Sequence, residues 1–355
     1  MALVDLKNIT MPELGQLLED LGIPSSRAPH IFREIYLYGC VDIGGMAGLK
    51  GKYRLSLAQR CRISGLAVET AEVSEDGTTK FAFRLDDGRL IETVLIPQGE
   101  RLTLCLSSQV GCAMACDFCL TGTMGLVRNL RPAEIVGQVL AVIAYLQEKG
   151  VKRATAREYI NNLVFMGMGE PLANYDNLIA ALKILMAPEG LEFTERRVTV
   201  STCGLAPRIE DLGRDARVNL AISLHAADDE TRSRLMPVNR SHNLERLLAA
   251  CKKFPLARKR VILMEYILLA GINDSPEQAR QLALLLQGVP CRVNLLPYNE
   301  SAGLDYCRPG EEVIIEFKKI LYQAGIRAFV RDSRGSDISA ACGQLARGAL
   351  PEEPL

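Results

Sequence analysis

The chain has 355 residues, of which 48% are hydrophobic and 24% charged, and its formal net charge is zero. This composition excludes a disordered chain and fits one large α/β domain plus a smaller one. The sequence has no apolar run long enough to cross a bilayer and no signal-peptide pattern, and its eleven cysteines suit a reducing compartment, so we expect a cytoplasmic protein with no membrane partner.

Residues 1–68 have a helical pattern. Met11-Pro12-Glu13 opens a predicted helix that stops near Gly22, and a second helix is predicted from Ala28 to Tyr38. A basic run from Lys50 to Arg62 lies in this part, and another runs from Lys252 to Arg260. Either run can meet phosphates or form a solvated face, and the zero net charge gives no overall support for nucleic-acid binding.

Residues 69–98 change to a period of two. The turn dipeptides Asp76-Gly77 and Asp87-Gly88 separate apolar runs, which predicts a short antiparallel β meander. In its last run Glu92 shares a face with Leu90, Val94 and Ile96. A carboxylate on an apolar face is a candidate functional group, and the alternative is an edge residue turned to solvent.

From residue 99 to 347 strands and helices alternate. The clearest helix begins near Pro132 and stops at Gly150. Repeated β-α units predict parallel strands in a curved sheet, a partial β/α barrel with functional residues at the carboxyl ends of the strands. Residues 348–355 are expected to form a flexible tail. The predicted strands are Leu102–Leu106, Leu163–Met168, Val198–Ser201, Leu220–Leu224, Val261–Ile267, Val293–Leu296 and Ala328–Val330.

Three cysteines, Cys112, Cys116 and Cys119, stand with three and then two residues between them. Three thiolates can bind a four-iron four-sulfur cluster and leave one iron free for a substrate. Structural zinc is the alternative, and it needs a fourth ligand such as His225 or Cys105. Isolated cysteines are usually buried small hydrophobes, which we expect of Cys40, Cys61, Cys203, Cys251, Cys291 and Cys307.

The cysteine spacing is that of the radical S-adenosylmethionine enzymes, and further motifs resemble the RlmN/Cfr family of RNA adenosine methyltransferases. These motifs are Cys105, Met168-Gly169-Glu170-Pro171-Leu172, Ser201-Thr202-Cys203-Gly204, Ser223-Leu224-His225-Ala226 and Ala341-Cys342-Gly343-Gln344-Leu345. The resemblance implies an α/β fold, a partial (β/α)6-type radical SAM barrel with an N-terminal helical domain that helps hold RNA and a β-meander connector. Two departures are Tyr298, where the family often has tryptophan, and Leu120-Thr121-Gly122 after the cluster loop.

The resemblance also assigns residue roles. The cysteine triplet holds a [4Fe-4S] cluster, and Cys342, Cys105 and Glu92 are catalytic. Gly169 and Glu170 meet the methionine amino end of S-adenosylmethionine. The rest of that cofactor contacts Ser201, Ser223, Leu224, His225 and Asn299.

In the implied reaction, two molecules of S-adenosylmethionine are used per turnover. One methylates the Cys342 thiolate. The other yields a radical that activates this methyl group for addition to C2 of adenosine in 23S rRNA and tRNA. Glu92 then removes the ring proton, and Cys105 attacks the Cys342 sulfur to release the product and form a disulfide. An external electron donor such as flavodoxin or ferredoxin is implied, as is a monomeric enzyme.

Three other functions remain open from the sequence. One is methylation at C8, as in the antibiotic-resistance branch of the same family. Another is a zinc-stabilised RNA-binding module without catalysis, and the third is a radical enzyme that acts on a small molecule.

Overall fold

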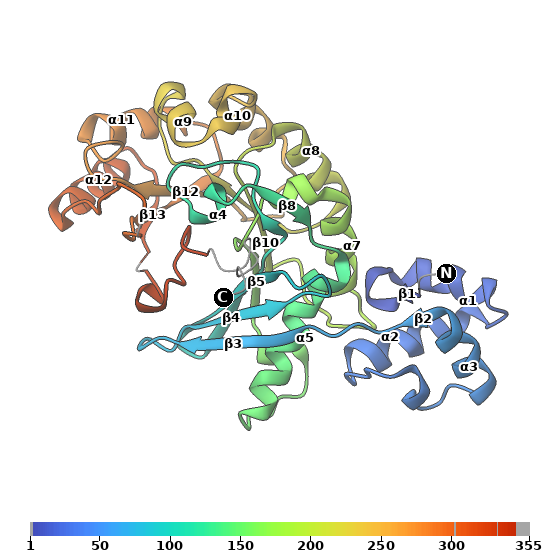
Figure 1. The fold of residues 1–355 in the computed structure, drawn as a ribbon. Coiled ribbons are helices and arrows are strands. Elements are labelled where there is room, and N and C mark those ends of the chain that lie inside the picture. The colour runs from blue at the N-terminus through green and yellow to red at the C-terminus, as the bar shows by residue number, and fades with distance from the viewer. Residues whose placement is uncertain (1–2, 302, 332, 346–355) are drawn as a thin grey trace.

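The computed structural model describes residues 3–301, 303–331 and 333–345. Their centre is a curved ten-stranded sheet with the strand order β14-β13-β12-β11-β10-β9-β6-β5-β4-β3 (Figure 1). The first seven strands of this order run parallel. They are β6 (Arg101–Cys105), β9 (Asn162–Phe165), β10 (Val198–Thr202), β11 (Asn219–Ser223), β12 (Ile262–Leu268), β13 (Cys291–Pro297) and β14 (Ala328–Val330).

Each parallel strand before β14 is followed by a helix that returns the chain to the start of the next strand. Pro132 at the start of α5 and the positive φ of Gly150 just after it fix the ends of the longest helix. Six β/α units result, and the predicted partial (β/α)6 barrel is confirmed. The helices are α5 (Pro132–Glu148), α7 (Tyr175–Leu185), α8 (Ala206–Asp215), α10 (Leu244–Lys253), α11 (Pro276–Leu285) and α12 (Glu311–Gln323), with the short α9 (Asp229–Leu235) between β11 and α10.

The predicted antiparallel meander is present and extends the barrel sheet. It consists of β3 (Ala67–Val73), β4 (Thr79–Arg84) and β5 (Leu90–Gln98), and β5 pairs with β6. Phe81 and Phe83 are buried, and Phe81 contacts Tyr145 of α5. Because side chains alternate along a strand, Lys80 and Glu92 lie on the opposite face, away from α5.

The N-terminal module, residues 3–62, lies beside α5 (Figure 1). It contains α1 (Met11–Asp20), α2 (Ala28–Tyr36) and α3 (Gly51–Arg60), and short parallel strands β1 (Val4–Asp5) and β2 (Cys61–Arg62) tie its two ends together. A capping box between Thr10 and Glu13 begins α1. The Ala133 amide of α5 donates to Asn8 Oδ1 at 2.9 Å, so the module is attached to the barrel at the start of α5.

All eleven cysteines are free. Cys61, Cys203 and Cys251 are buried as expected, whereas Cys40 and Cys291 are half-buried. The prediction was wrong for Cys307, which is exposed because it lies in the surface loop between β13 and α12. No described helix is both long and apolar enough to cross a membrane. The predicted tail, 348–355, falls outside the described residues.

Candidate active site

The three spaced cysteines lie in a loop closed by a small hairpin of β7 (Gln109–Gly111) and β8 (Leu126–Asn129), with the short α4 (Leu120–Thr123) inside the loop. The hairpin is tight at Gly111, where φ is +71° and a Cβ atom would lie 1.9 Å from the Gly125 carbonyl oxygen. Gly122 is restricted to a lesser degree, since a Cβ there would lie 2.9 Å from the Cys116 carbonyl oxygen. These glycines let the loop fold back on itself.

Apolar side chains surround the loop. Phe118, Leu235, Met236 and Tyr298 belong to one buried cluster, against which Met114, Cys116 and Cys119 pack. Burial raises the pKa of all three cysteine thiols, that of Cys112 to about 11. The positive charge of a bound metal would offset this rise in pKa, because the thiolate is the form of cysteine that binds metal.

The loop fits an iron–sulfur cluster by its donor set and its dry surroundings. Within the described residues, no group of three histidine, cysteine or acidic side chains converges on a single-ion site. Cysteines that each bind a different iron of a cluster have no need to converge on one point.

Glu170 is the main polar group beside the loop. It follows β9, is buried, and its Oε1 and Oε2 accept the Leu172 and Cys203 amides at 3.0 and 2.8 Å. Burial raises the pKa of this carboxyl, and Glu170 in turn raises the pKa of the Cys112 thiol. The preceding residue is Gly169, with φ +96°. Any side chain there would collide with Gln109, because a Cβ atom would lie 2.4 Å from the Gln109 Cβ. Glu170 therefore joins the ends of β9 and β10 next to the cysteines.

The other predicted cofactor residues follow along the same edge of the sheet. Ser201 pairs with Ala221 near the carboxyl end of β10, Ser223 ends β11, and Leu224 and His225 come next. Asn299 lies half-buried just beyond β13. Since these strands are parallel neighbours, the predicted residues share one rim.

His225 is held in one orientation. Its φ is +59°, its Nδ1 accepts the Ile267 amide at 3.0 Å, and its carbonyl accepts Asn273 Nδ2 at 2.8 Å. Burial lowers the pKa of the imidazole to about 3, so the ring is neutral and carries its proton on Nε2. The edge-to-face contact with Phe118 places this ring against the cysteine loop.

Sequence reasoning missed Arg232, a fully buried arginine on α9. Its guanidinium donates to the carbonyls of Cys203, Leu224 and Ser223 at 2.6, 3.0 and 3.2 Å, and to Asn239 Oδ1 at 2.8 Å. One cation thus ties the ends of β10 and β11. A single arginine in a charged helical segment carries no sequence signal that distinguishes it from a surface residue.

Cys342 lies in a carboxyl-terminal segment, residues 333–345, that meets the cysteine loop. The Leu120 amide donates to the Gly343 carbonyl at 2.8 Å, and Thr121 Oγ1 donates to the Leu345 carbonyl at 2.5 Å. Cys342 has exposed surface, yet the protein atoms packed around its thiol raise the pKa to about 11. Burial and then the charge of Cys342 raise the pKa of Cys105. The Ile338 carbonyl of the Cys342 segment accepts a hydrogen bond from Lys80 Nζ at 2.6 Å, and Lys80 lies in the same strand row as Cys105.

Glu92 lies on the same face of the sheet as Cys105. In the strand register Lys80, Val94 and Cys105 form a row across β4, β5 and β6, and Glu92 is two residues from Val94. Glu92 is 1% exposed, and its Oε1 lies 3.5 Å from Lys80 Nζ. The solvent-facing alternative for Glu92 is therefore wrong.

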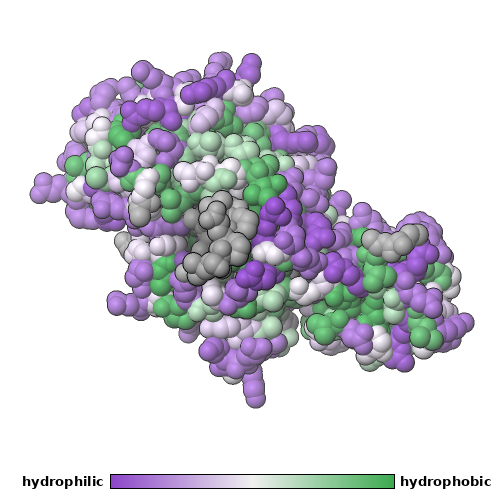
Figure 2. All heavy atoms as spheres, in the orientation of Figure 1, coloured by the Kyte–Doolittle hydropathy of each residue, from purple (hydrophilic) through white to green (hydrophobic). Residues whose placement is uncertain are grey.

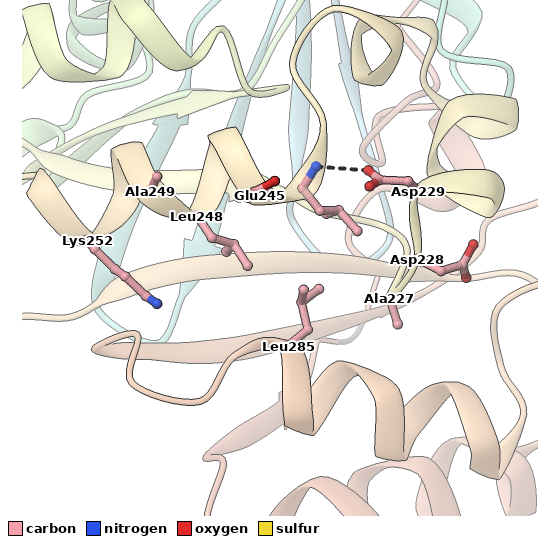
Figure 3. A pocket seen from close by; sticks show the side chains of 9 residues that line it. Ala227, Asp228, Asp229, Glu245, Leu248, Ala249, Lys252 and Leu285 are labelled. Carbon is pink, nitrogen blue, oxygen red and sulfur yellow. Dashed lines mark hydrogen bonds between the residues drawn. The ribbon is translucent and has the colours of Figure 1, made fainter.

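A second buried carboxyl, Glu265 on β12, also escaped sequence reasoning. It accepts Asn294 Nδ2 at 2.9 Å, burial raises its pKa, and its charge raises that of Cys342. A surface pocket of ≈ 550 Å³ between α10 and α11 contains none of the predicted site residues (Figure 3).

The comparisons with known proteins agree with this geometry. The Radical SAM superfamily model matches residues 106–283. The "Dual-specificity RNA methyltransferase RlmN" of Desulfotalea psychrophila is 49% identical, over 97% of this chain and 95% of the relative. The protein of the same name from Geobacter sulfurreducens is 48% identical, over 97% and 92%.

Among solved structures, a radical SAM methyltransferase from Sphaerobacter thermophilus superposes with a TM-score of 0.88 at 44% identity, covering 96% of this chain and 99% of that one. The superfamily match implies an iron–sulfur cluster and S-adenosylmethionine, which the cysteine loop and the rim beside it fit. The chain therefore belongs to the radical S-adenosylmethionine superfamily and, within it, to the RlmN family of RNA methyltransferases.

Proposed function

We propose that this enzyme methylates C2 of adenosine in RNA, with 23S rRNA and tRNA as substrates, through a methylated Cys342. The observation that carries the proposal is the docking of the Cys342 segment. It hydrogen-bonds to the loop of Cys112, Cys116 and Cys119, and to Lys80, which lies in the same strand row as Cys105. The relatives are named dual-specificity RNA methyltransferases, which supports two RNA substrates.

The cysteine triplet would hold a [4Fe-4S] cluster, and the rim from Gly169 to Asn299 would hold S-adenosylmethionine. When bound, these groups supply the methyl carbon and the radical needed at an aromatic carbon that has no lone pair, with two molecules of S-adenosylmethionine per turnover. The buried, apolar surroundings of the loop exclude water from this chemistry.

The protein's own groups carry the remaining steps. The Cys342 thiolate takes the methyl group and, after the carbon has joined adenine, holds the RNA covalently. Glu92 Oε1 or Oε2 accepts the ring proton. The Cys105 thiolate then attacks the Cys342 sulfur. The bond from that sulfur to the transferred carbon breaks, and the carbon keeps the electron pair and takes a proton. The unpaired electron that radical addition leaves on the adduct would return to the cluster that the cysteine loop would hold, and a disulfide remains for external reduction.

The N-terminal module, within the predicted domain 1–68, is the proposed support for RNA. Lys50, Lys52 and Arg60 are exposed on or beside α3 and can neutralise phosphates. Tyr38, 68% exposed, offers an aromatic face for an unstacked base. Figure 2 shows hydrophobic patches on this module beside hydrophilic surface.

The proposal also covers the cellular location, the roles of the domains and the electron donor. Free cysteines and an RNA substrate fit the cytoplasm. We place residues 69–98 as the connector and 99–347 as the catalytic core of a monomer, and flavodoxin or ferredoxin as the class of electron donor.

Two variants test the mechanism, with anaerobically reconstituted enzyme and an rRNA fragment. Cys342→Ala is expected to keep its iron and sulfide but to make no methylated RNA. Cys105→Ala is expected to accumulate a covalent enzyme–RNA complex on denaturing gels, and Cys307→Ala, a change at an exposed thiol, is the control. Free methylated RNA from Cys105→Ala would contradict the mechanism. If digests of the wild-type product contain 8-methyladenosine, the enzyme methylates C8 of adenosine instead of C2.

A further inference from the structure

Lys80 is a buried lysine that the mechanism above does not use. It lies in the middle of the meander on β4, and only 6% of its surface is exposed. Burying an ammonium group is costly unless it is paired. Its three partners come from three different parts of the chain: Glu92 Oε1 on β5 and Glu72 Oε2 on β3, each at 3.5 Å, and the carbonyl oxygen of Ile338 at 2.6 Å.

Ile338 belongs to the segment that carries Cys342. The turn between β3 and β4 binds the same segment at several points, since Ser74 Oγ donates to Asp337 Oδ1 at 2.6 Å and the Gly335 amide donates to Asp76 Oδ2 at 3.2 Å. These contacts are at the surface or only partly buried. Among the described residues, Lys80 is the buried cation of this contact, and it also reaches Glu92.

We propose that Lys80 is a positioning residue that couples the proton acceptor Glu92 to the segment carrying Cys342. The inference rests on the proposed function, in which Glu92 accepts the ring proton while the RNA is bound to Cys342. The ammonium group lies 3.5 Å from Glu92 Oε1 and orients that carboxyl group on the face of the sheet that it shares with Cys105. Its hydrogen bond to Ile338 is present only when the Cys342 segment is seated against the meander.

The proton step balances without another reagent. The C–H bond of the adduct breaks, an O–H bond forms on Glu92, and Lys80 stays charged throughout. Lys80 touches none of the transferred atoms. Its effect is therefore expected in one step, release of the adduct, and in the seating of residues 335–342.

The test compares Lys80→Met, which removes the charge but keeps most of the side-chain length, with Glu92→Gln and with the double variant. Lys319→Met, at an exposed lysine of α12 paired with Glu316, is the matched control. Three quantities are measured: methylation of Cys342 by mass spectrometry, covalent enzyme–RNA complex on denaturing gels, and hydrogen exchange of residues 335–342 without RNA.

Lys80→Met is expected to methylate Cys342, to accumulate the covalent complex and to release product roughly 10- to 100-fold more slowly, which is at or below the lower end of the roughly 100- to 10,000-fold that positioned proton transfer contributes. The double variant should be no slower than Glu92→Gln alone, because Lys80 acts through Glu92. Exchange in residues 335–342 should rise in Lys80→Met and stay unchanged in Lys319→Met.

Rescue by the conservative variant gives a readout that loosened packing would not move. Lys80→Arg keeps a cation within reach of Glu92 and of the Ile338 carbonyl. It should release the adduct faster than Lys80→Met, and equal rates for the two variants would contradict a role of the charge.

The outcomes distinguish a failure of the proposed function from a failure of the proposed role of Lys80. Wild-type enzyme without methylated Cys342, or Glu92→Gln without accumulated complex, would overturn the proposed function. With those two behaving as expected, Lys80→Met that releases product at the wild-type rate, or that loses Cys342 methylation without accumulating the complex, would overturn the role of Lys80.

Discussion

Arg232→Met is expected to lower the free energy of unfolding strongly, although Arg232 is not one of the predicted cofactor-binding residues. The arginine is fully buried on α9, and methionine fills most of its volume without its charge. The change removes the donors that satisfy the Cys203 and Leu224 carbonyls and Asn239 Oδ1.

The magnitude follows from these three acceptors. Each buried acceptor left without a donor costs about 1–3 kcal/mol, which sums to about 3–9 kcal/mol. Part is recovered because the buried guanidinium is itself poorly solvated, as the lowered pKa of Arg232 indicates. We expect a net loss of about 3–5 kcal/mol, a large share of the roughly 5–15 kcal/mol that stabilises a typical domain.

The assay is urea unfolding of cluster-free protein, followed by far-ultraviolet circular dichroism. Arg214→Met on α8 is the control, because Arg214 is exposed and pairs with Asp211 and Asp215 at the surface; its effect should stay within about 0.5 kcal/mol. Since Arg232 fixes the carbonyl ends of β10 and β11, binding of S-adenosylmethionine should also weaken about tenfold or more. A loss below about 1 kcal/mol, or one equal to the control, would refute the reasoning.

Two further changes probe the loop and the rim. Gly111→Ala should cost at least about 2 kcal/mol more than Gly88→Ala and lower the iron and sulfide content, because both glycines have positive φ but only the Cβ at Gly111 meets a backbone oxygen; equal melting temperatures would contradict this. His225 is neutral in the fold with a pKa of about 3, while an unfolded histidine titrates near 6.5, so the unfolded chain binds the extra proton between these values. Stability should therefore fall by up to about 1.4 kcal/mol per unit as pH drops below about 6.5, and His225→Asn should flatten this slope in urea unfolding at pH 5, 6 and 7.5; parallel curves for the two proteins would show that His225 does not titrate on unfolding.

Local pattern predicted most of the fold and the cysteine loop. The seven strand runs, the turns at Gly77 and Gly88 and the stop at Gly150 are all present, because each depends on a few adjacent residues. The placement of Glu92 was accessible through strand alternation, although only the register showed that it shares a face with Cys105.

What the sequence did not predict depends on contacts between distant segments. Lys80 and Ile338 are 258 residues apart, and Arg232 acts on carbonyls of β10 and β11 that carry no residue-type signal. The exposure of Cys307 shows the same limit, since residue type alone does not reveal whether a loop cysteine is covered.

The docking of the carboxyl-terminal segment has a consequence for biosynthesis. The cysteine loop and the meander are complete in the chain long before residues 333–345 leave the ribosome, and those late residues meet partners as far back as Ser74. Docking of the segment that carries the proposed methyl carrier is thus a long-range contact, the slow kind of folding event. Under the proposed mechanism, a nascent chain that has not reached position 342 has no thiol to accept the methyl group.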